Sequence, residues 1–201
     1  MKTLYRSIME RDFKNTIKCF LCKCSYGYKK PADKEGTKPE FLLQDDLQKK
    51  LEKEDYHVER NYKVNVEQLP VLPSLNEYVL KIDFEVKKED ELHCFIEVKY
   101  DEEYEEGKDL KCTNSQSEEE VIRDAYKLQC LKKKYKNALC LVIFATNKSS
   151  HWEKFVSMPQ GEQSLTYNGK VEKFYLESLT TRGIQWNEAR NENYQYCIIE
   201  I

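Results

Sequence analysis

The stretches Ile82-Asp83-Phe84 and Ile96-Glu97-Val98-Lys99 predict two neighbouring β-strands joined by a short polar turn. Residues two apart on a strand point to the same face of a sheet, so Glu97 and Lys99 emerge side by side. On the preceding strand, alternate residues form one expected apolar face: Tyr78, Leu80, Ile82, Phe84 and Val86. If the two strands pair as a hairpin, the opposite face collects Asp83, Glu97 and Lys99.

These three side chains have the chemistry of a metal-dependent site for phosphodiester cleavage. Two carboxylates can hold a hard divalent cation, and the Val98 carbonyl between Glu97 and Lys99 offers a further oxygen ligand. The Lys99 ammonium can stabilise an oxyanion or help to deliver a water molecule. The competing interpretation is an ordinary ion pair on a strand, worth well under about 1 kcal/mol if it is exposed.

The segments before these strands predict a helix and a third strand. Thr37-x-x-Glu40 fits a capping box, and leucines four residues apart continue the pattern to near Glu54, so a helix is expected there. A strand is expected over Tyr56–Val66. The two strands that carry the acidic residues then span roughly Tyr78–Lys87 and Leu92–Tyr100.

The segments after these strands predict a crossover connection. Ser117-x-x-Glu120 fits a second capping box, which opens a helix to about Tyr135. The nearly continuous apolar run ALCLVIFAT at 138–146 predicts a strand buried on both faces, and a helix before it indicates a parallel crossover. The order α-β-β-β-α-β predicts an α/β fold with helices on both sides of a sheet.

Weaker patterns follow residue 146. A short helix is expected at Ser149–Val156, a tight hairpin turn at Asn168-Gly169, and a closing strand within Glu192–Ile201.

Further charged residues are candidates for the same site. Glu40 lies on the apolar stripe of the first helix, where it can turn toward the sheet or serve only as a capping residue. Glu59 is its rival, because a Glu on a strand can also face the cluster. On the second helix Lys127 is a candidate phosphate contact, and so is Lys81 beside Asp83. The role of Asp124, on the same side of that helix, is left open.

Composition limits the class of protein. The chain has 201 residues, a net charge of -3 and a pI of about 5.8, which excludes a uniformly basic nucleic-acid binder. A local basic patch could still contact phosphates. The sequence predicts a basic, Cys-containing extension at 1–36 and one domain at 37–201, with its core at 37–146 and additions at 147–201. No signal peptide or membrane partner is expected.

The eight cysteines indicate reduced thiols in a cytoplasmic protein, because they are scattered and several fall inside expected helices or strands. Cys19, Cys22 and Cys24 offer three thiolates, whereas a structural zinc site needs four ligands. Structural zinc is therefore not predicted.

The ordered pattern resembles the PD-(D/E)XK superfamily of restriction-endonuclease-like nucleases over roughly residues 37–146, with Ile82 in place of the proline of the name. The resemblance implies a restriction-endonuclease-like core, with a central mixed sheet flanked by helices. It also implies hydrolysis of nucleic acid, usually DNA, with Mg²⁺ or Mn²⁺. By this likeness Asp83 and Glu97 bind the metal and Lys99 activates the attacking water. Glu40 is the supporting acid, and Lys127 matches a polar position on the following helix.

The sequence therefore predicts a metal-dependent phosphodiesterase of the endodeoxyribonuclease type. A homodimer is one expected assembly, since cutting both strands of a duplex usually needs two sites. The alternatives are a catalytically inactive relative that binds nucleic acid or a protein, an interaction module built around the N-terminal cysteines, and a protein in which Asp83, Glu97 and Lys99 are surface charges only.

Overall fold

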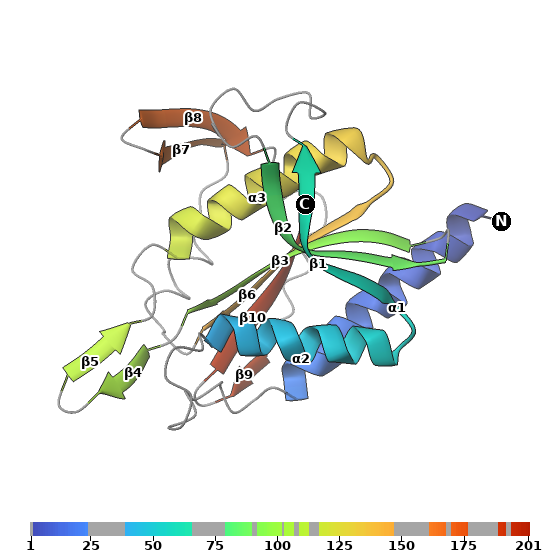
Figure 1. Ribbon diagram of the computed structural model, residues 1–201, viewed down its shortest axis with the longest axis horizontal. Coiled ribbons are helices and arrows are strands. Elements are labelled where there is room, and N and C mark those ends of the chain that lie inside the picture. Colours follow the sequence, from blue (N-terminus) through green and yellow to red (C-terminus); the bar gives the residue numbers. More distant parts are fainter. Residues whose placement is uncertain are drawn as a thin grey trace.

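The computed structural model describes residues 2–23, 39–65, 79–89, 92–101, 103–106, 109–112, 117–146, 161–167, 170–176, 189–191 and 194–201. A mixed sheet runs through the middle of the molecule, with strand order β1-β2-β3-β6-β10-β9, and helices cover both of its faces (Figure 1). The helices are α1 (Lys2–Lys23), α2 (Pro39–Lys53) and α3 (Ser117–Lys134). The sheet contains β1 (His57–Asn65), β2 (Val79–Lys88), β3 (Leu92–Asp101), β6 (Leu139–Thr146), β9 (Ala189–Asn191) and β10 (Tyr194–Glu200).

Two small hairpins lie outside this sheet. β4 (Glu103–Glu106) pairs with β5 (Asp109–Cys112), and β7 (Gly161–Tyr167) pairs with β8 (Lys170–Leu176). The β7–β8 pairing runs up to Tyr167 opposite Lys170, so the two strands form the hairpin that the sequence predicts, whereas Asn168 and Gly169 lie outside the described residues. The predicted helix at Ser149–Val156 and the predicted N-cap Thr37 lie outside the described residues.

The predicted order of elements is confirmed. α2, β1, β2, β3, α3 and β6 follow one another as α-β-β-β-α-β, and the protein is an α/β protein with a mixed sheet. β3 and β6 pair in parallel through the α3 crossover, whereas β1–β2, β2–β3 and β6–β10 are antiparallel. All residues of β6 are buried, as its apolar sequence predicts.

Each face of the sheet has its own hydrophobic core. On one face α3 packs through Val121, Ala125, Leu128 and Leu131 against the sheet. On the other face lie α1 and α2, whose buried stripe is formed by Leu43, Leu47 and Leu51 of α2 together with apolar residues of α1. Figure 1 shows the two helix layers on opposite sides of the strands.

The prediction that β2 has a single apolar face is wrong. Leu80 and Ile82 pack in the core beneath α3, whereas Phe84 and Val86 pack in the core beneath α1 and α2. The side-chain alternation therefore changes face at Asp83. The β1–β2 register passes from Phe84 to Ile82 without a pair at Asp83.

The opposite strand explains this break. Asn61 of β1, which would face Asp83, has a φ of 51°. Asparagine tolerates this left-handed conformation better than most residues, so it can interrupt a strand at low cost. The break therefore lies in both strands of the β1–β2 pair. It lets the part that contains Val64, Leu80 and Ile82 pack toward α3.

The predicted boundary near residue 36 implied a separate N-terminal extension. In the structure, α1 of this segment instead packs against the core. Phe13, Ile17, Phe20 and Leu21 of α1 are buried in the same cluster as α2 and the sheet. At the level of side chains, the Cys22 thiol lies 2.9 Å from the Tyr196 hydroxyl of β10. α1 is therefore part of the α/β unit.

All the cysteines whose side chains the structure describes, Cys19, Cys22, Cys94, Cys130, Cys140 and Cys197, are free thiols. Cys24 lies outside the described residues. Among the described helices, none is both long enough and apolar enough to span a membrane.

The packing of α1 predicts a large cost for removing one of its buried side chains. Ile17 has no exposed surface, so Ile17→Ala should lower the free energy of unfolding by about 2–5 kcal/mol. The exposed neighbour Lys18 provides the control, since Lys18→Ala should change it by no more than about 0.5 kcal/mol. Urea unfolding measures both, and equally small effects would show that α1 is not part of the folded unit.

Candidate active site

The first two carboxylates lie where β2 and β3 part. The antiparallel pairing of these strands ends at Phe84 opposite Ile96, so Val98 has no partner on β2 in the ladder. The Val98 N–H instead donates to Asp83 Oδ2 at 2.8 Å. An antiparallel residue exchanges both its N–H and its C=O with one partner strand, so the Val98 carbonyl faces the same gap.

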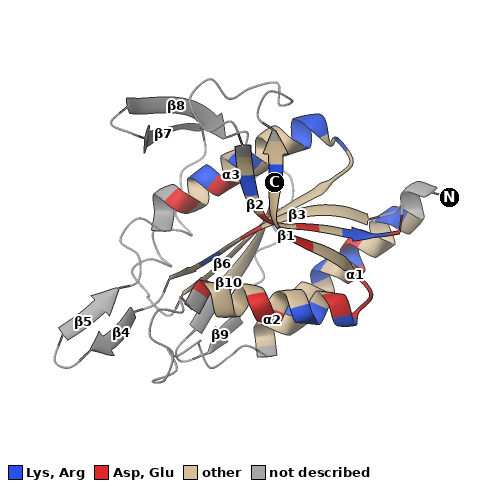
Figure 2. Ribbon diagram, viewed as in Figure 1, with Lys and Arg blue, Asp and Glu red and all other residues tan. Residues whose placement is uncertain are grey.

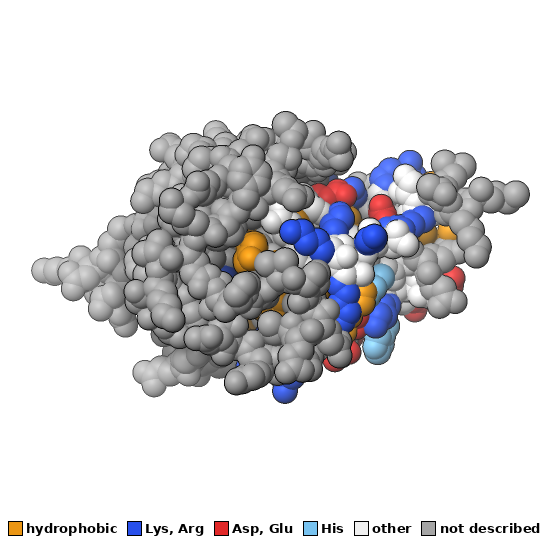
Figure 3. Space-filling view, turned by 90° about the horizontal axis from the view of Figure 1, so that it is seen from above, with side chains coloured by type: hydrophobic (Ala, Val, Ile, Leu, Met, Phe, Trp, Pro, Cys, Tyr) orange, Lys and Arg blue, Asp and Glu red, His pale blue; other side chains and the backbone are white. Residues whose placement is uncertain are grey.

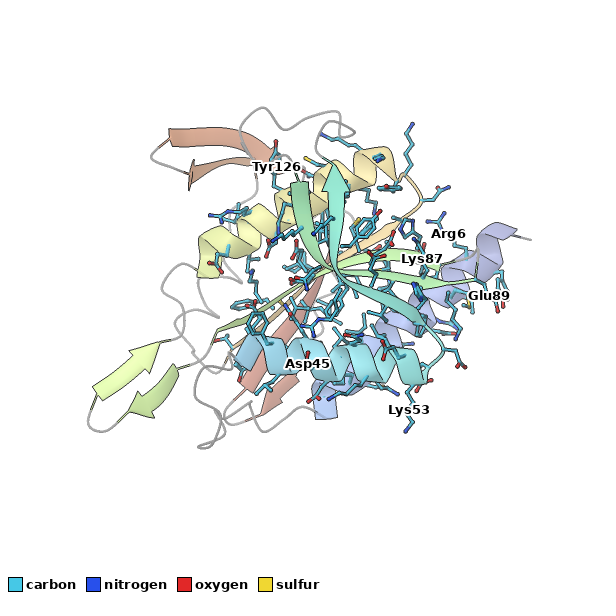
Figure 4. All side chains as sticks on the ribbon, viewed as in Figure 1. Arg6, Asp45, Lys53, Lys87, Glu89 and Tyr126 are labelled. Atoms are coloured by element: carbon cyan, nitrogen blue, oxygen red, sulfur yellow. The ribbon has the colours of Figure 1, made fainter. Side chains whose placement is uncertain are left out.

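Glu40 enters this gap from α2. Its Oε2 accepts a hydrogen bond from the Tyr100 N–H at 3.5 Å, two residues further along β3. α2 is held against β1 by Arg60, which donates to Gln44 at 3.0 Å and also to Asp45, a residue near the middle of α2 (Figure 4). Glu40 and Asp83 thus each accept a hydrogen bond from one backbone N–H of β3, where a neighbouring strand would otherwise provide the acceptor.

Two further acidic residues lie between β3 and α3. Glu97 of β3 is 2% exposed and Asp124 of α3 is 3% exposed. The Lys127 ammonium lies 2.5 Å from Glu97 Oε1 and 2.6 Å from Asp124 Oδ1, and so bridges the two carboxylates. α3 carries acidic and basic residues along its length (Figure 2), and one of each sign, Asp124 and Lys127, belongs to this group of contacts.

Lys99 connects the two pairs of carboxylates. Its ammonium lies 3.5 Å from Asp124 Oδ2 and 3.7 Å from Glu120 Oε2. The carboxylates of Glu40 and Asp83 also act on its charge. We refer to Glu40, Asp83, Glu97, Lys99, Asp124 and Lys127 as the carboxylate–lysine cluster.

Burial shifts the pKa values of the acids in this cluster. It raises the pKa of Glu40 to about 7, despite the opposing effect of the Lys99 ammonium. Burial also raises the pKa of Asp83, although the Val98 N–H opposes this shift. The pKa of Glu97 is raised well above its usual range by burial and by Asp124, against the effect of Lys127.

The two lysines remain charged. Burial favours their neutral forms, but the surrounding carboxylates outweigh it and raise the pKa of both Lys99 and Lys127. The cluster therefore contains four carboxyl groups, two of them buried and two half-buried, and only two ammonium groups to balance them. The excess favours either proton uptake or binding of an additional cation.

The donor chemistry of the cluster fits a hard divalent cation. All of its acidic groups offer oxygen ligands. Asp124 Oδ2 is buried and accepts no hydrogen bond from the described part of the protein. However, no group of three or more His, Cys, Asp or Glu residues among those described is arranged to hold a metal ion. The Lys127 ammonium lies between two of the carboxylates that such an arrangement would use.

Another acid on β2, Glu85, is buried but differs from the acids of the carboxylate–lysine cluster in its partners. Glu85 is 3% exposed, but His93 Nε2 and Lys87 Nζ each lie 2.8 Å from one of its two oxygens. These two partners balance the single carboxylate, so Glu85 needs no ligand and stabilises the β2–β3 hairpin.

The structure brings together most of the residues predicted for the site. Glu40, Asp83, Glu97, Lys99 and Lys127 all belong to the cluster. Asp83 reaches it through the break in β2 and a hydrogen bond into the gap, rather than through the regular sheet face that the alternation predicts.

The remaining candidates lie elsewhere or take other positions. Lys81 is exposed, and only its backbone carbonyl approaches the cluster, 3.5 Å from Lys127 Nζ. Glu59 is exposed on β1, so Glu40 is the acid that reaches the gap. Lys127, predicted to contact a phosphate, contacts the buried acids Glu97 and Asp124. Asp124, whose role the sequence left open, contacts both Lys99 and Lys127. The sequence feature that could have identified it is a charged residue on the apolar face of a helix.

Comparisons with known proteins identify no relative: no protein-family model, no curated protein and no solved structure matches the chain.

The raised pKa of Glu40 predicts how stability depends on pH. Its ordinary value is 4.5 and its value in the folded protein is about 7. The folded state therefore holds a proton that the unfolded state releases between these values, and stability falls as the pH rises through this window. The Glu40→Gln variant should not lose stability through this window. The difference in the free energy of unfolding between this variant and wild type should therefore rise by about 1–3 kcal/mol between about pH 5 and about pH 8.

Urea unfolding at the two pH values measures this effect. Glu59→Gln removes a Glu that is exposed on β1, and should show no such pH-dependent gain. The same stability difference between Glu40→Gln and wild type at both pH values would contradict the placement of Glu40 in the cluster.

Proposed function

We propose that this protein is a metal-dependent nuclease that hydrolyses phosphodiester bonds of nucleic acid, with DNA as the expected substrate. One observation carries the proposal: buried or half-buried carboxyl groups from α2, β2, β3 and α3 converge with two lysines where β2 separates from β3. Structural ion pairs seldom need so many buried acids, because each acid costs free energy to bury.

The order of elements supports the same proposal. The sequence resembles PD-(D/E)XK nucleases, and that resemblance implies the helix, three strands, helix and parallel strand found in α2–β6. It also implies an acid on the second strand and a Glu-x-Lys motif on the third, the positions of Asp83 and of Glu97 with Lys99. Membership of that superfamily is part of the proposal.

The residues of the cluster suit the roles proposed for them. Asp83, Glu97 and the Val98 carbonyl would hold Mg²⁺ or Mn²⁺. A bound divalent ion would polarise a phosphate oxygen and lower the pKa of a water molecule. The Lys99 ammonium would stabilise negative charge that develops on the phosphate. Glu40, with a pKa of about 7, can exchange a proton with water near neutral pH.

The charge of the surface allows a polyanionic partner despite the net charge of -3. Lys63 of β1 and Lys81 of β2 are directly opposite each other and both are exposed. Like charges at such positions repel, and a phosphate between them would relieve that repulsion. Lys and Arg side chains also gather on the described part of the face shown in Figure 3.

A catalytically inactive relative that binds nucleic acid is the second candidate. The observation that favours it is the pairing of Lys127 with Glu97 and Asp124, together with the lack of a three-ligand arrangement among the described residues. Such a protein would keep the basic surface and would not cleave.

A cleavage assay tests the nuclease proposal. Plasmid and single-stranded DNA are incubated with wild type, Asp83→Asn and Lys99→Met, with Mg²⁺, Mn²⁺ or a chelator. Wild type should cleave only with metal. Each substitution should reduce the rate by about 100-fold or more, because it removes a metal ligand or the charge that stabilises the transition state.

The matched control for the acids is Glu59→Gln, an exposed residue of β1, which should cleave like wild type. Circular dichroism confirms that each variant is folded. Equal cleavage by all variants would mean that a contaminant or another site is responsible. Salt-sensitive DNA binding by wild type without cleavage would favour the inactive relative.

A further inference from the structure

We infer that the Lys127 ammonium competes for Glu97 with the divalent cation of the proposed site, and that the cation also contacts Asp124 once Lys127 has left, so that Lys127 regulates metal binding. This inference rests on the proposed function. It concerns a property that the proposed cleavage reaction does not require, namely competition between a side chain of this protein and its metal.

The contacts of Lys127 are those of a bound cation. Its ammonium lies 2.5 Å from a Glu97 oxygen, 2.6 Å from an Asp124 oxygen and 3.5 Å from the Lys81 carbonyl oxygen. Two carboxylates and a backbone carbonyl are also the kinds of ligand that hard divalent ions take. The ammonium thus fills a position lined by oxygen atoms from β2, β3 and α3.

The same contacts explain why the described residues contain no ready metal-binding group. Glu97 and Asp124 each give one oxygen to Lys127, and Asp83 gives one oxygen to the Val98 N–H. A cation bound to Glu97 would lie next to the positively charged ammonium, and this repulsion must be removed before the metal can bind.

Lys127 can leave without unfolding α3. The side chain is 14% exposed, so part of it reaches the surface, and its ammonium is carried on a flexible four-carbon chain. Its departure would leave two buried carboxylates without a partner, and either proton uptake or another cation would have to compensate their charge. Lys99 would remain as the fixed ammonium, paired with Asp124 and Glu120. The displaced Lys127 would then be free to contact a substrate phosphate near Lys81.

Calorimetric titration of chelator-treated protein with Mn²⁺ tests the inference. Lys127→Met keeps much of the length of the side chain but has no charge. It should bind Mn²⁺ about 10- to 100-fold more tightly than wild type, because no charge-assisted hydrogen bonds have to be broken first. Its melting temperature should be lower than wild type without metal and should rise more on adding Mn²⁺. The matched control Lys127→Arg keeps the competing charge and should bind about as wild type does.

A second measurement uses the wild-type protein, in case Lys127→Met does not fold. In ¹⁵N-labelled protein the Lys127 ammonium signal, assigned by its absence from Lys127→Arg, should be protected from solvent exchange without metal. Saturating Mg²⁺ should abolish that protection.

The outcomes separate this inference from the proposed function. Wild-type metal binding that Asp83→Asn abolishes, but that Lys127→Met does not strengthen, overturns the inference alone. An unchanged Lys127 signal at saturating Mg²⁺ does the same. Failure of both wild type and folded Lys127→Met to bind Mn²⁺ or Mg²⁺ overturns the inference and the metal-dependent nuclease proposal together.

Discussion

The hydrogen bond from the Val98 N–H to the Asp83 carboxylate is the interaction on which the site depends. It lies where the β2–β3 ladder ends, and it replaces a backbone partner with a side chain. Because a buried N–H needs an acceptor, the separation of the strands requires a group such as Asp83. That separation admits Glu40 from α2 and exposes the edge of β3 to the acids around it.

Charge balance is the second constraint. The raised pKa values of Glu40, Asp83 and Glu97 share one main cause, the removal of carboxyl groups from water. The two lysines reduce the free-energy cost of burying these acids without removing it. Asp124 contacts both lysines and so links the two ion pairs. A protein whose only requirement was stability would gain by replacing such groups with apolar ones. The metal ion of the proposed nuclease would balance their charge.

The sequence predicted the elements better than it predicted the details of the site. The helices α2 and α3, the leucine stripe of α2 and the apolar strand β6 were predicted from local patterns, and the structure confirms these elements. The change of face at Asp83 was missed, because it arises from Asn61, which is distant in sequence. The packing of α1 was missed because the charges in this helix obscure its buried side. The contacts of Asp124 depend on how α3 lies on β3, which spacing alone does not fix.

The central claim is that the carboxylates of α2, β2, β3 and α3 form one cation site. It is tested most directly by anomalous diffraction from a crystal soaked in Mn²⁺. The account predicts an anomalous peak in contact with the carboxylates of Asp83 and Glu97, with Lys127 moved away from Glu97. A well-ordered crystal with no peak at these residues, and with Lys127 still between Glu97 and Asp124, would contradict it.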